Sequence, residues 1–272
     1  MISEQRIRQF RDTVWDVYVQ RGRTMPWRSD PSPYHVVVSE IMLQQTQVDR
    51  VIPKFLAWVE QWSDFEALSQ STTEEVLSAW QGLGYNRRAL WLKDLAREVV
   101  ATHGGRLPDT HAVLTEFKGI GPNTAGAILA YAYEQPVVFI ETNIRRVILH
   151  EFFPDRDDVA DKEIMPIVEA ALDAEHPREW YWALMDYGSE LPKRVVNPNR
   201  RSKHYARQSK FAGSHRQLRG AILARVLEEK TIVPSALAGL LDRSDEEIAQ
   251  TIDELVREGF LNRGENGITM KA

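Results

Sequence analysis

Two glutamates, Glu40 and Glu141, stand in sequence surroundings that suit acid–base chemistry. The segment VVVSEIMLQQTQV (36–48) predicts a helix whose apolar residues face a core, which places Glu40 on a polar stripe with Gln44 and Gln47. Such a stripe alone is more typical of an ordinary amphipathic helix. The alternative is a carboxylic acid in a cleft, beside amides that can enter a stack of bases.

Glu141 follows the apolar run PVVFI and precedes a helix that Thr142 or Asn143 opens. The helix dipole and free amide donors at a helix start keep a carboxylate ionised, so it can face a developing cation without taking up a proton. For an isolated glutamate, however, simple helix capping is the more common role.

A third motif, LTEFKGIGPNTA (114–125), predicts a short helix, a Gly-Ile-Gly hairpin and a second helix that begins at Pro122. The free N–H groups at such a helix start, together with the helix dipole, can hold a phosphate with little help from side chains. A plain helix–loop–helix corner is the alternative for this motif taken alone.

Composition restricts the class of protein. With 272 residues, 43% of them hydrophobic, the chain can form one large globular domain or two smaller ones. Its apolar runs are shorter than the ~20 residues that cross a bilayer, and residues 1–20 do not resemble a signal peptide. We therefore expect a cytoplasmic protein without membrane contact. Because the chain has no cysteine and its histidines lack ligand spacing, we expect no cofactor, no iron–sulfur cluster and no metal.

The net charge of −5 conceals a local basic segment. Residues 191–219 contain nine basic residues and no acidic one. A solvated linker would show this pattern, but the interspersed aromatic and amide residues favour a strap that packs on the domain and grips phosphates. Candidate phosphate contacts in it are Arg200, Arg201 and Lys203.

Helical periodicity dominates residues 1–190. After the strap, residues 220–272 predict three short helices and a two-stranded hairpin, the outline of a winged helix. The third of these helices is strongly acidic, and phosphates would repel it. We therefore expect this module to dock on the catalytic domain or on a protein partner, with DNA reading the less favoured role.

Together these segments resemble the helix-hairpin-helix (HhH-GPD) DNA glycosylase superfamily, and within it the MutY-like adenine glycosylases. The resemblance covers roughly residues 1–190 and runs, in matched order, through MPWR (25–28), SPYHVVVSEIMLQQTQV (32–48), WQGLGYNRRA (80–89), FKGIGPNTAGAIL (117–129), ETNIRRV (141–147) and LMDYGS (184–189). It implies an all-α, two-lobed helix-hairpin-helix fold, here followed by the winged-helix-like module.

The resemblance also implies roles for single residues. Glu40 takes the position of the general acid that protonates the excised base, and Glu141 that of the carboxylate that stabilises the sugar cation. Gln44 and Gln45 match residues that fill the duplex where a nucleotide is flipped out, and Tyr85 matches a wedge beside the opposite base. The further DNA contacts that it implies are Thr46, Arg87, Gly119, Gly121, Asn123 and Thr124.

Four departures from the family pattern matter. The family has aspartate where this chain has Glu141, and Asn123 stands where bifunctional relatives carry a lysine nucleophile, so base removal without strand cleavage is expected. The basic strap stands in place of the four-cysteine cluster loop, and the winged-helix-like module stands in place of the domain that recognises 8-oxoguanine.

The sequence therefore predicts a monofunctional DNA glycosylase of base excision repair, monomeric and nucleoid-associated, which acts on double-stranded DNA. Its expected substrate is a mispaired base, foremost adenine opposite 8-oxoguanine or guanine. Two alternatives stay open at this point: a glycosylase for thymine or uracil opposite guanine or for another damaged base, and a catalytically weakened protein that binds lesions.

Overall fold

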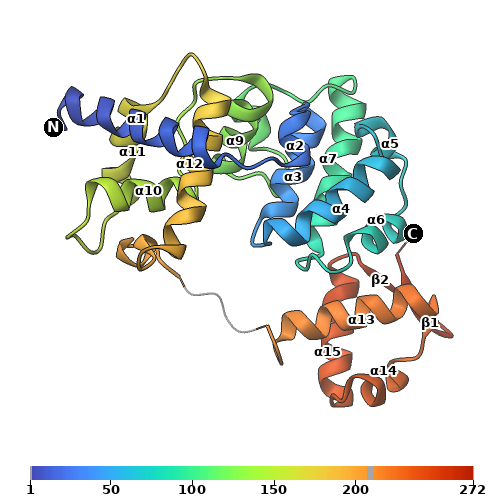
Figure 1. Cartoon of the computed structure of the whole chain (residues 1–272). Coiled ribbons are helices and arrows are strands. Elements are labelled where there is room, and N and C mark those ends of the chain that lie inside the picture. Colours follow the sequence, from blue (N-terminus) through green and yellow to red (C-terminus); the bar gives the residue numbers. More distant parts are fainter. Residues whose placement is uncertain (1, 207–210, 272) are drawn as a thin grey trace. The chain divides into compact units, whose positions relative to one another are not determined.

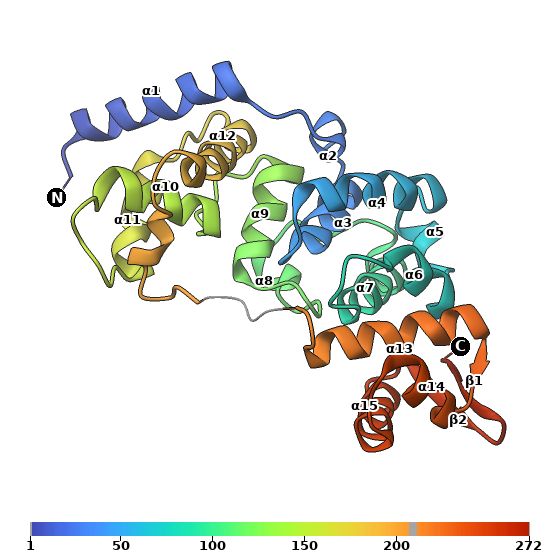
Figure 2. The same ribbon diagram turned by 60° about the horizontal axis from the view of Figure 1, so that its bottom comes forward.

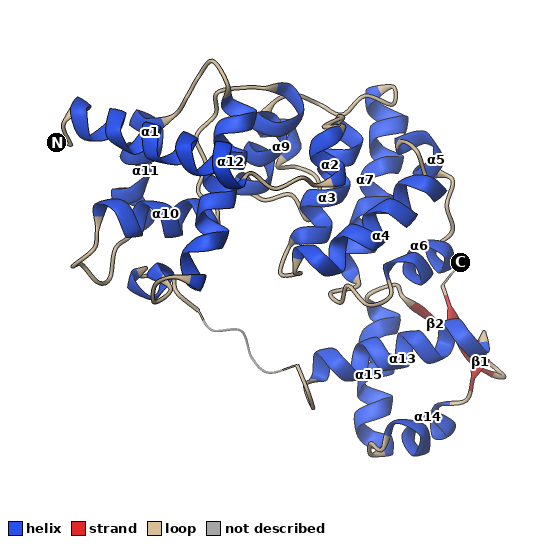
Figure 3. Cartoon of the chain, viewed as in Figure 1, coloured by secondary structure: helices blue, strands red, loops and turns tan. Residues whose placement is uncertain are grey.

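A computed structural model describes residues 2–206 and 211–271, and most of them are helical (Figures 1 and 3). The chain divides into two compact units. The first unit comprises residues 1–40 and 107–207, and the second comprises residues 41–106 and 208–272. Each unit is thus built from two separate stretches of sequence.

The first unit is helical throughout its described part. Its elements are α1 (Glu4–Arg21), α2 (Pro26–Ser29), most of α3 (Pro33–Leu43), α8 (His111–Leu114), α9 (Pro122–Tyr133), α10 (Thr142–Phe152), α11 (Asp161–Ala171), α12 (Pro177–Glu190) and two short 3-10 turns, η1 (Leu191–Lys193) and η2 (Pro198–Arg201). Helix α12 lies against both α1 and α10.

Aromatic side chains fill the core between these helices. The ring of Phe10 on α1 meets Phe152 edge to face at 5.1 Å and Trp180 on α12 at 6.1 Å. At Gly188, an added Cβ would lie only 2.5 Å from the carbonyl oxygen of Asn143. Helix α12 can therefore approach the start of α10 closely only because it carries a glycine there.

The second unit combines a helical part with a small sheet. Its elements are α4 (Val48–Gln61), α5 (Phe65–Ser69), α6 (Thr73–Trp80), α7 (Arg87–His103), α13 (His215–Glu229), β1 (Thr231–Ile232), α14 (Pro234–Leu241), α15 (Asp245–Arg257), β2 (Leu261–Gly264) and β3 (Gly267–Met270). Buried Trp58 packs against Trp62 and Trp80, with ring centres at 4.6 and 5.6 Å, and so ties α4 to α6.

The C-terminal stretch forms three helices and an antiparallel three-stranded sheet in the order β1-β3-β2. Strand β3 occupies the centre, with Ile232 opposite Ile268 and Leu261 opposite Met270. Helix α13 packs on this sheet and also contacts α6 of the same unit (Figure 2). These are the elements of the predicted winged-helix-like module, with β1 as a strand that the sequence did not predict.

Two expectations about local structure need correction. The helix predicted over 36–48 ends at Leu43, and Gln44 and Gln45 lie in the turn that leads to α4. The end of the predicted strap, from His215 onward, belongs to helix α13.

The predicted domains 1–190, 191–219 and 220–272 stay predictions, and basic residues Arg207 and Lys210 of the strap lie outside the described residues. Within the described part of the chain, no helix combines the length and the apolar character that a membrane span requires.

Candidate active site

Glu40 lies on a helix that is buried almost all round. Its neighbours Val38 and Ser39 on one side and Ile41 and Met42 on the other are each at most 1% exposed. Glu40 itself keeps partial access to solvent. The predicted polar stripe with Gln44 and Gln47 therefore does not exist, because both glutamines lie beyond the helix. Burying an ionisable group in such a helix costs folding free energy. Because this cost is rarely retained without a purpose, a functional role for Glu40 is favoured.

Glu141 is the N-cap of helix α10. Its Oε2 atom accepts the backbone N–H of Asn143 at 2.6 Å, and the side-chain amide of Asn143 lies 3.4 Å from its Oε1. The carboxylate also accepts the N–H of Ile144. Glu141 thus does cap its helix, and the same amide donors favour its ionised form.

The start of α10 is fixed from three sides. The Asn123 side-chain oxygen accepts the N–H of Ile140, the residue before Glu141, at 3.4 Å. Arg146 donates through Nη1 to the Asn143 side-chain oxygen and to the Gly188 carbonyl, both at 2.6 Å. These contacts hold the Glu141 carboxylate in one orientation.

The two carboxyls influence one another electrostatically. The pKa of Glu40 is raised to about 8, chiefly by burial and further by the negative charge of Glu141, and Arg28 opposes the rise. Burial also raises the pKa of Glu141, against the amide bonds from Asn143 and the charges of Arg146 and Arg145. The amide donors and arginines beside Glu141 favour its charged form, whereas the pKa of Glu40 near 8 favours its protonated form, so Glu40 is the candidate proton donor and Glu141 the candidate anion. One group is then a proton donor and the other an anion, which is the pairing that cleavage of a glycosidic bond needs.

An arginine that sequence reasoning missed lies in the same unit. The Arg28 side chain is 8% exposed and donates to both oxygens of buried Asp186, at 2.8 and 2.9 Å. Arg23 adds its backbone N–H at 2.8 Å and its Nε at 2.7 Å to the same carboxylate. Asp186 therefore fixes the cation that opposes the pKa rise of Glu40. The available signal was the pair of segments MPWR and LMDYGS, which contain Arg28 and Asp186.

Two aromatic side chains, Trp182 and Tyr131, belong to the surroundings of the two carboxylates. The ring of Trp182 lies under the guanidinium of Arg28 at 5.3 Å and is stacked on Tyr131, with ring centres 6.2 Å apart. The pKa of Tyr131 is raised well above its usual value, first by burial and then by the charges of Glu40 and Glu141. Its hydroxyl consequently stays protonated as a potential donor. The flat rings suit a planar, uncharged ligand such as a nucleobase.

The backbone of the glycine hairpin at Gly119 to Gly121 has a geometry that lets a ligand approach it closely. Gly119 has a φ of 86°, which favours glycine, and Gly121 is the N-cap of α9. An added Cβ at Gly121 would meet nothing within 4 Å, so its open surface is free for a ligand. Asn123 is exposed and Thr124 is half-buried in the first turn of α9. Their phosphate contacts stay predictions.

In the second unit, the predicted wedge residues lie on strained turns. Gln45 has a φ of 56° and Tyr85 one of 49°, values that residues with side chains rarely adopt. Buried Arg88 holds both turns, because its guanidinium donates to the carbonyls of Gln44 at 2.6 Å and Gly84 at 3.0 Å. The family resemblance did not single out Arg88, although it lies in the matched segment WQGLGYNRRA.

Some predicted DNA contacts already have partners within the protein. The Thr46 hydroxyl accepts from Arg88 at 3.2 Å, and Arg87 pairs with Glu258 at 2.6 Å. Arg201 donates to the carbonyls of Leu149 and Pro154, both at 2.9 Å. Arg201 therefore holds the strap on the first unit through these hydrogen bonds.

The described part of the strap up to residue 206 packs on the first unit. The Asn199 side chain donates to the Thr142 carbonyl at 3.0 Å, next to Glu141, and the backbone of Val159 pairs with that of Arg201 and Lys203. Arg200 and Lys203 remain exposed and available to phosphates. Among the described residues, no group of three or more histidine, aspartate or glutamate side chains is arranged to hold a metal ion.

Comparison with known proteins finds relatives among the proteins of DNA repair. The family model of the HhH-GPD superfamily base excision DNA repair proteins matches residues 38–170. The adenine DNA glycosylase of Mycolicibacterium smegmatis is 31% identical over 268 residues, which cover 92% of each chain. That of Mycobacterium tuberculosis is 39% identical over 143 residues, covering 52% of this chain and 47% of the relative. That of Buchnera aphidicola is 32% identical over 182 residues, covering 66% of this chain and 52% of the relative.

Solved structures give the same fold. A thermostable thymine-DNA glycosylase superimposes with a TM-score of 0.63 at 23% identity, over 71% of this chain and 91% of that one. A trapped endonuclease III–DNA covalent intermediate gives a TM-score of 0.57 at 16% identity, over 68% of this chain and 85% of that one.

The chain belongs to the HhH-GPD superfamily of base excision DNA repair proteins. The predicted family and the predicted all-α fold class are thereby confirmed, and the names of the relatives agree with the predicted DNA glycosylase function. The chain spans only about half the length of two of these three curated relatives.

Proposed function

We propose that this protein is a monofunctional DNA glycosylase that hydrolyses the N-glycosidic bond of a flipped adenine in a purine mismatch. The single observation that carries the proposal is the pairing of Glu40 and Glu141: the charge of Glu141 helps to raise the pKa of Glu40 to about 8, while the Glu141 carboxylate accepts the backbone N–H of Asn143 at 2.6 Å. The names of the curated relatives support adenine as the base.

In the proposed reaction, Glu40 donates its proton to the leaving base as the bond from the base nitrogen to the sugar breaks. The sugar then carries positive charge, which the Glu141 carboxylate stabilises. Water supplies hydroxide to the sugar carbon, and its remaining proton restores Glu40. The products are free adenine and an abasic site, and no redox step or metal is required.

In this proposal, side chains near Glu40 position the flipped base and select which base is bound. Trp182 and Tyr131 offer flat surfaces for a purine, and Arg28, fixed by Asp186, offers donors to an acceptor atom of the base. Because Asn123 is an amide, no Schiff base with the sugar can form, and base removal proceeds without strand cleavage.

The remaining contacts of the proposed enzyme are with double-stranded DNA. Arg200 and Lys203 of the strap contact phosphates, the hairpin at Gly119 to Gly121 holds the backbone, and Gln44, Gln45 and Tyr85 fill the duplex. Thr124 supports the hairpin contact, while Thr46, Arg87 and Arg201 act through their protein partners. We further propose that the protein acts as a nucleoid-associated monomer in the cytoplasm and that the acidic face of α15 receives a protein partner.

A panel of labelled duplexes tests this function. Each carries one pair, A·8-oxoguanine, A·G, T·G or U·G, and hot alkali after incubation converts every abasic site into a strand break. The expected result is product from the two adenine pairs, none from T·G or U·G, and none without alkali. Product only from T·G or U·G would show that the excised base is a pyrimidine and not adenine. Binding without product from any pair would show that the protein binds lesions without excising a base.

A further inference from the structure

Helix α13 brings an arginine to Tyr85 within the second unit. Arg216 donates a hydrogen bond from Nη1 to the Tyr85 hydroxyl, and its guanidinium carbon lies 4.9 Å from the centre of the Tyr85 ring. The same carbon lies 5.4 Å from the ring of Phe211, which is 55% exposed. A planar cation therefore bridges two aromatic rings at the protein surface.

The charge of Arg216 is left without a carboxylate, in contrast to its neighbours on the helix. His215 lies 3.2 Å from Glu254, and Arg219 pairs with Glu254 at 3.3 Å and with Glu258. Within the described residues, no aspartate or glutamate forms an ion pair with Arg216. Of its five N–H donors, the Tyr85 hydroxyl takes one. The cation is thus available to an external anion or acceptor.

Contacts within the protein fix the position of Tyr85 in the absence of a ligand. Its left-handed backbone follows Gly84, which has a φ of 71°, and Arg88 fixes the Gly84 carbonyl. The Arg88 guanidinium carbon also lies 5.6 Å from the Tyr85 ring. An aromatic residue held in a costly conformation by buried hydrogen bonds indicates a functional constraint on that ring.

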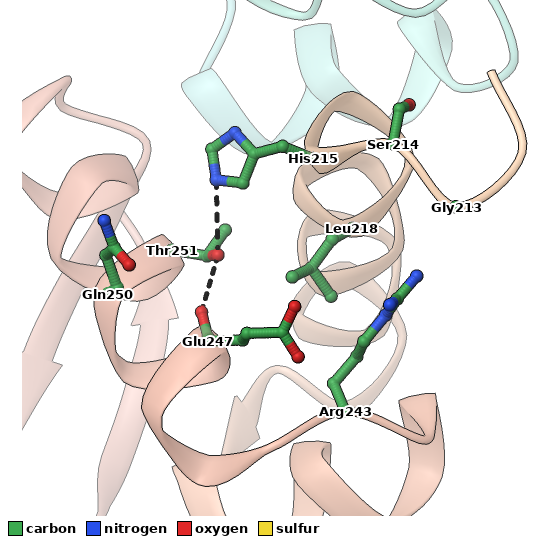
Figure 4. A pocket seen from close by; sticks show the side chains of 8 residues that line it. All are labelled: Gly213, Ser214, His215, Leu218, Arg243, Glu247, Gln250 and Thr251. Atoms are coloured by element: carbon green, nitrogen blue, oxygen red, sulfur yellow. Dashed lines mark hydrogen bonds between the residues drawn. The ribbon is translucent and has the colours of Figure 1, made fainter. Parts of the chain in front are cut away.

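The pocket shown in Figure 4 offers a weaker candidate on the same module. It has a volume of about 160 Å³ and is lined by Gly213, Ser214, His215, Leu218, Arg243, Glu247, Gln250 and Thr251. In it, the Thr251 hydroxyl donates to the Glu247 carbonyl at 2.7 Å and lies 3.4 Å from His215. The lining of this pocket contains no phenylalanine, tyrosine or tryptophan, whereas Arg216 lies beside two such rings.

We infer that Tyr85, Arg216 and Phe211 form a stacking platform for an unpaired nucleobase of bound DNA. Aromatic rings and guanidinium planes are the surfaces on which unstacked bases lie, and the remaining guanidinium donors can reach a base edge or the adjoining phosphate. This inference rests on the proposed function, because extrusion of one base leaves its former partner unpaired. The C-terminal module would then contact DNA through the start of α13, although its acidic helix α15 would not.

The test uses a duplex in which a tetrahydrofuran abasic analogue faces 2-aminopurine. Fluorescence reports the stacking of 2-aminopurine, and anisotropy of an end label gives Kd. Arg216→Ala is expected to weaken binding to this duplex about tenfold, the order expected for loss of one stacking contact, and to change binding to a fully paired duplex less than about twofold. Phe211→Ala, a change at an exposed side chain that spares the fold, is expected to weaken binding about threefold or more.

Matched variants separate stacking from charge. Arg225→Ala, on the same helix but paired with Glu228, is expected to leave both Kd values unchanged. Arg216→Lys keeps the charge without the plane and is expected to bind the abasic duplex about as weakly as Arg216→Ala, with the same change in 2-aminopurine fluorescence.

Two results would overturn the platform. Unchanged affinity and fluorescence in both Arg216→Ala and Phe211→Ala would show that no base stacks there, and tighter binding by Arg216→Ala would show that Arg216 masks Tyr85. The analogue has no glycosidic bond, so this assay does not depend on base release. Failure of the adenine assay would therefore be a separate finding.

Discussion

At the residue scale, the two carboxyls of the proposed site differ in their surroundings. Both are glutamates, yet Glu40 lies in a buried helix, whereas Glu141 receives backbone amides at the start of α10. Burial raises the pKa of both groups, and the amide hydrogen bonds and the charges of Arg145 and Arg146 oppose that rise at Glu141. Glu141 replaces the aspartate of the family pattern, and its longer side chain still reaches the amide of Asn143.

A titration of Glu40 follows from this arrangement. Glu141→Gln removes the negative charge that helps to raise the pKa of Glu40 to about 8, so the pKa of Glu40 is expected to fall in this variant. It should stay above 4.5, since burial is the larger cause and remains. Carbon-detected NMR of labelled glutamate measures this pKa, and an unchanged value would show that the two carboxyls do not interact.

The sequence indicated the two carboxyls of the proposed site better than their surroundings. Glu40 and Glu141 could be predicted because each lies in a recognisable motif. The role of Asp186 could not, because its effect on Glu40 runs through Arg28, and these contacts join segments about 160 residues apart. Periodicity also extended α3 too far, since Gln44 and Gln45 have ordinary helix propensities and only the contacts of Arg88 reveal the turn.

At the scale of elements, the strap and the start of α10 form one structural assembly. The Asn199 amide holds the Thr142 carbonyl, and Arg201 holds two further carbonyls at and beyond the end of the same helix. In this chain, which has no cysteine for a cluster, hydrogen bonds fasten the segment that follows α12.

Asn199→Ala is expected to destabilise the protein by about 1–2 kcal/mol, because a buried hydrogen bond is lost and the Thr142 carbonyl loses its donor. Base release should also slow, since Thr142 adjoins Glu141. Arg200→Ala, at an exposed neighbour, is the control and should change stability by less than about 0.5 kcal/mol. Thermal unfolding measures both, and equal melting temperatures for the two variants would contradict the role given to Asn199.

At the scale of the whole molecule, the proposed function requires an acidic protein to bind a polyanion. The net charge is −5, so affinity has to come from local basic groups rather than from the overall field. The sequence revealed the basic segment, but only the structure shows that Arg201 is engaged while Arg200 and Lys203 are exposed.

Salt dependence distinguishes these groups. Each of Arg200→Ala and Lys203→Ala is expected to reduce the slope of log K against log salt by about 1, because each removes one phosphate contact. Lys162→Ala, an exposed lysine on α11, is the matched control and should leave the slope unchanged. Slopes equal to that of the unaltered protein in both strap variants would exclude the strap from the DNA interface.

The pH dependence of adenine release under single-turnover conditions tests the paired carboxyls most directly. Glu40 must be protonated and Glu141 ionised, so the rate should fall as pH rises through about 8, and should also fall on the acid side, at a pH above the ordinary glutamate value. Glu40→Gln should abolish release at every pH while DNA affinity is kept. A rate that stays constant from pH 6 to pH 9, or equal release by Glu40→Gln, would contradict the account.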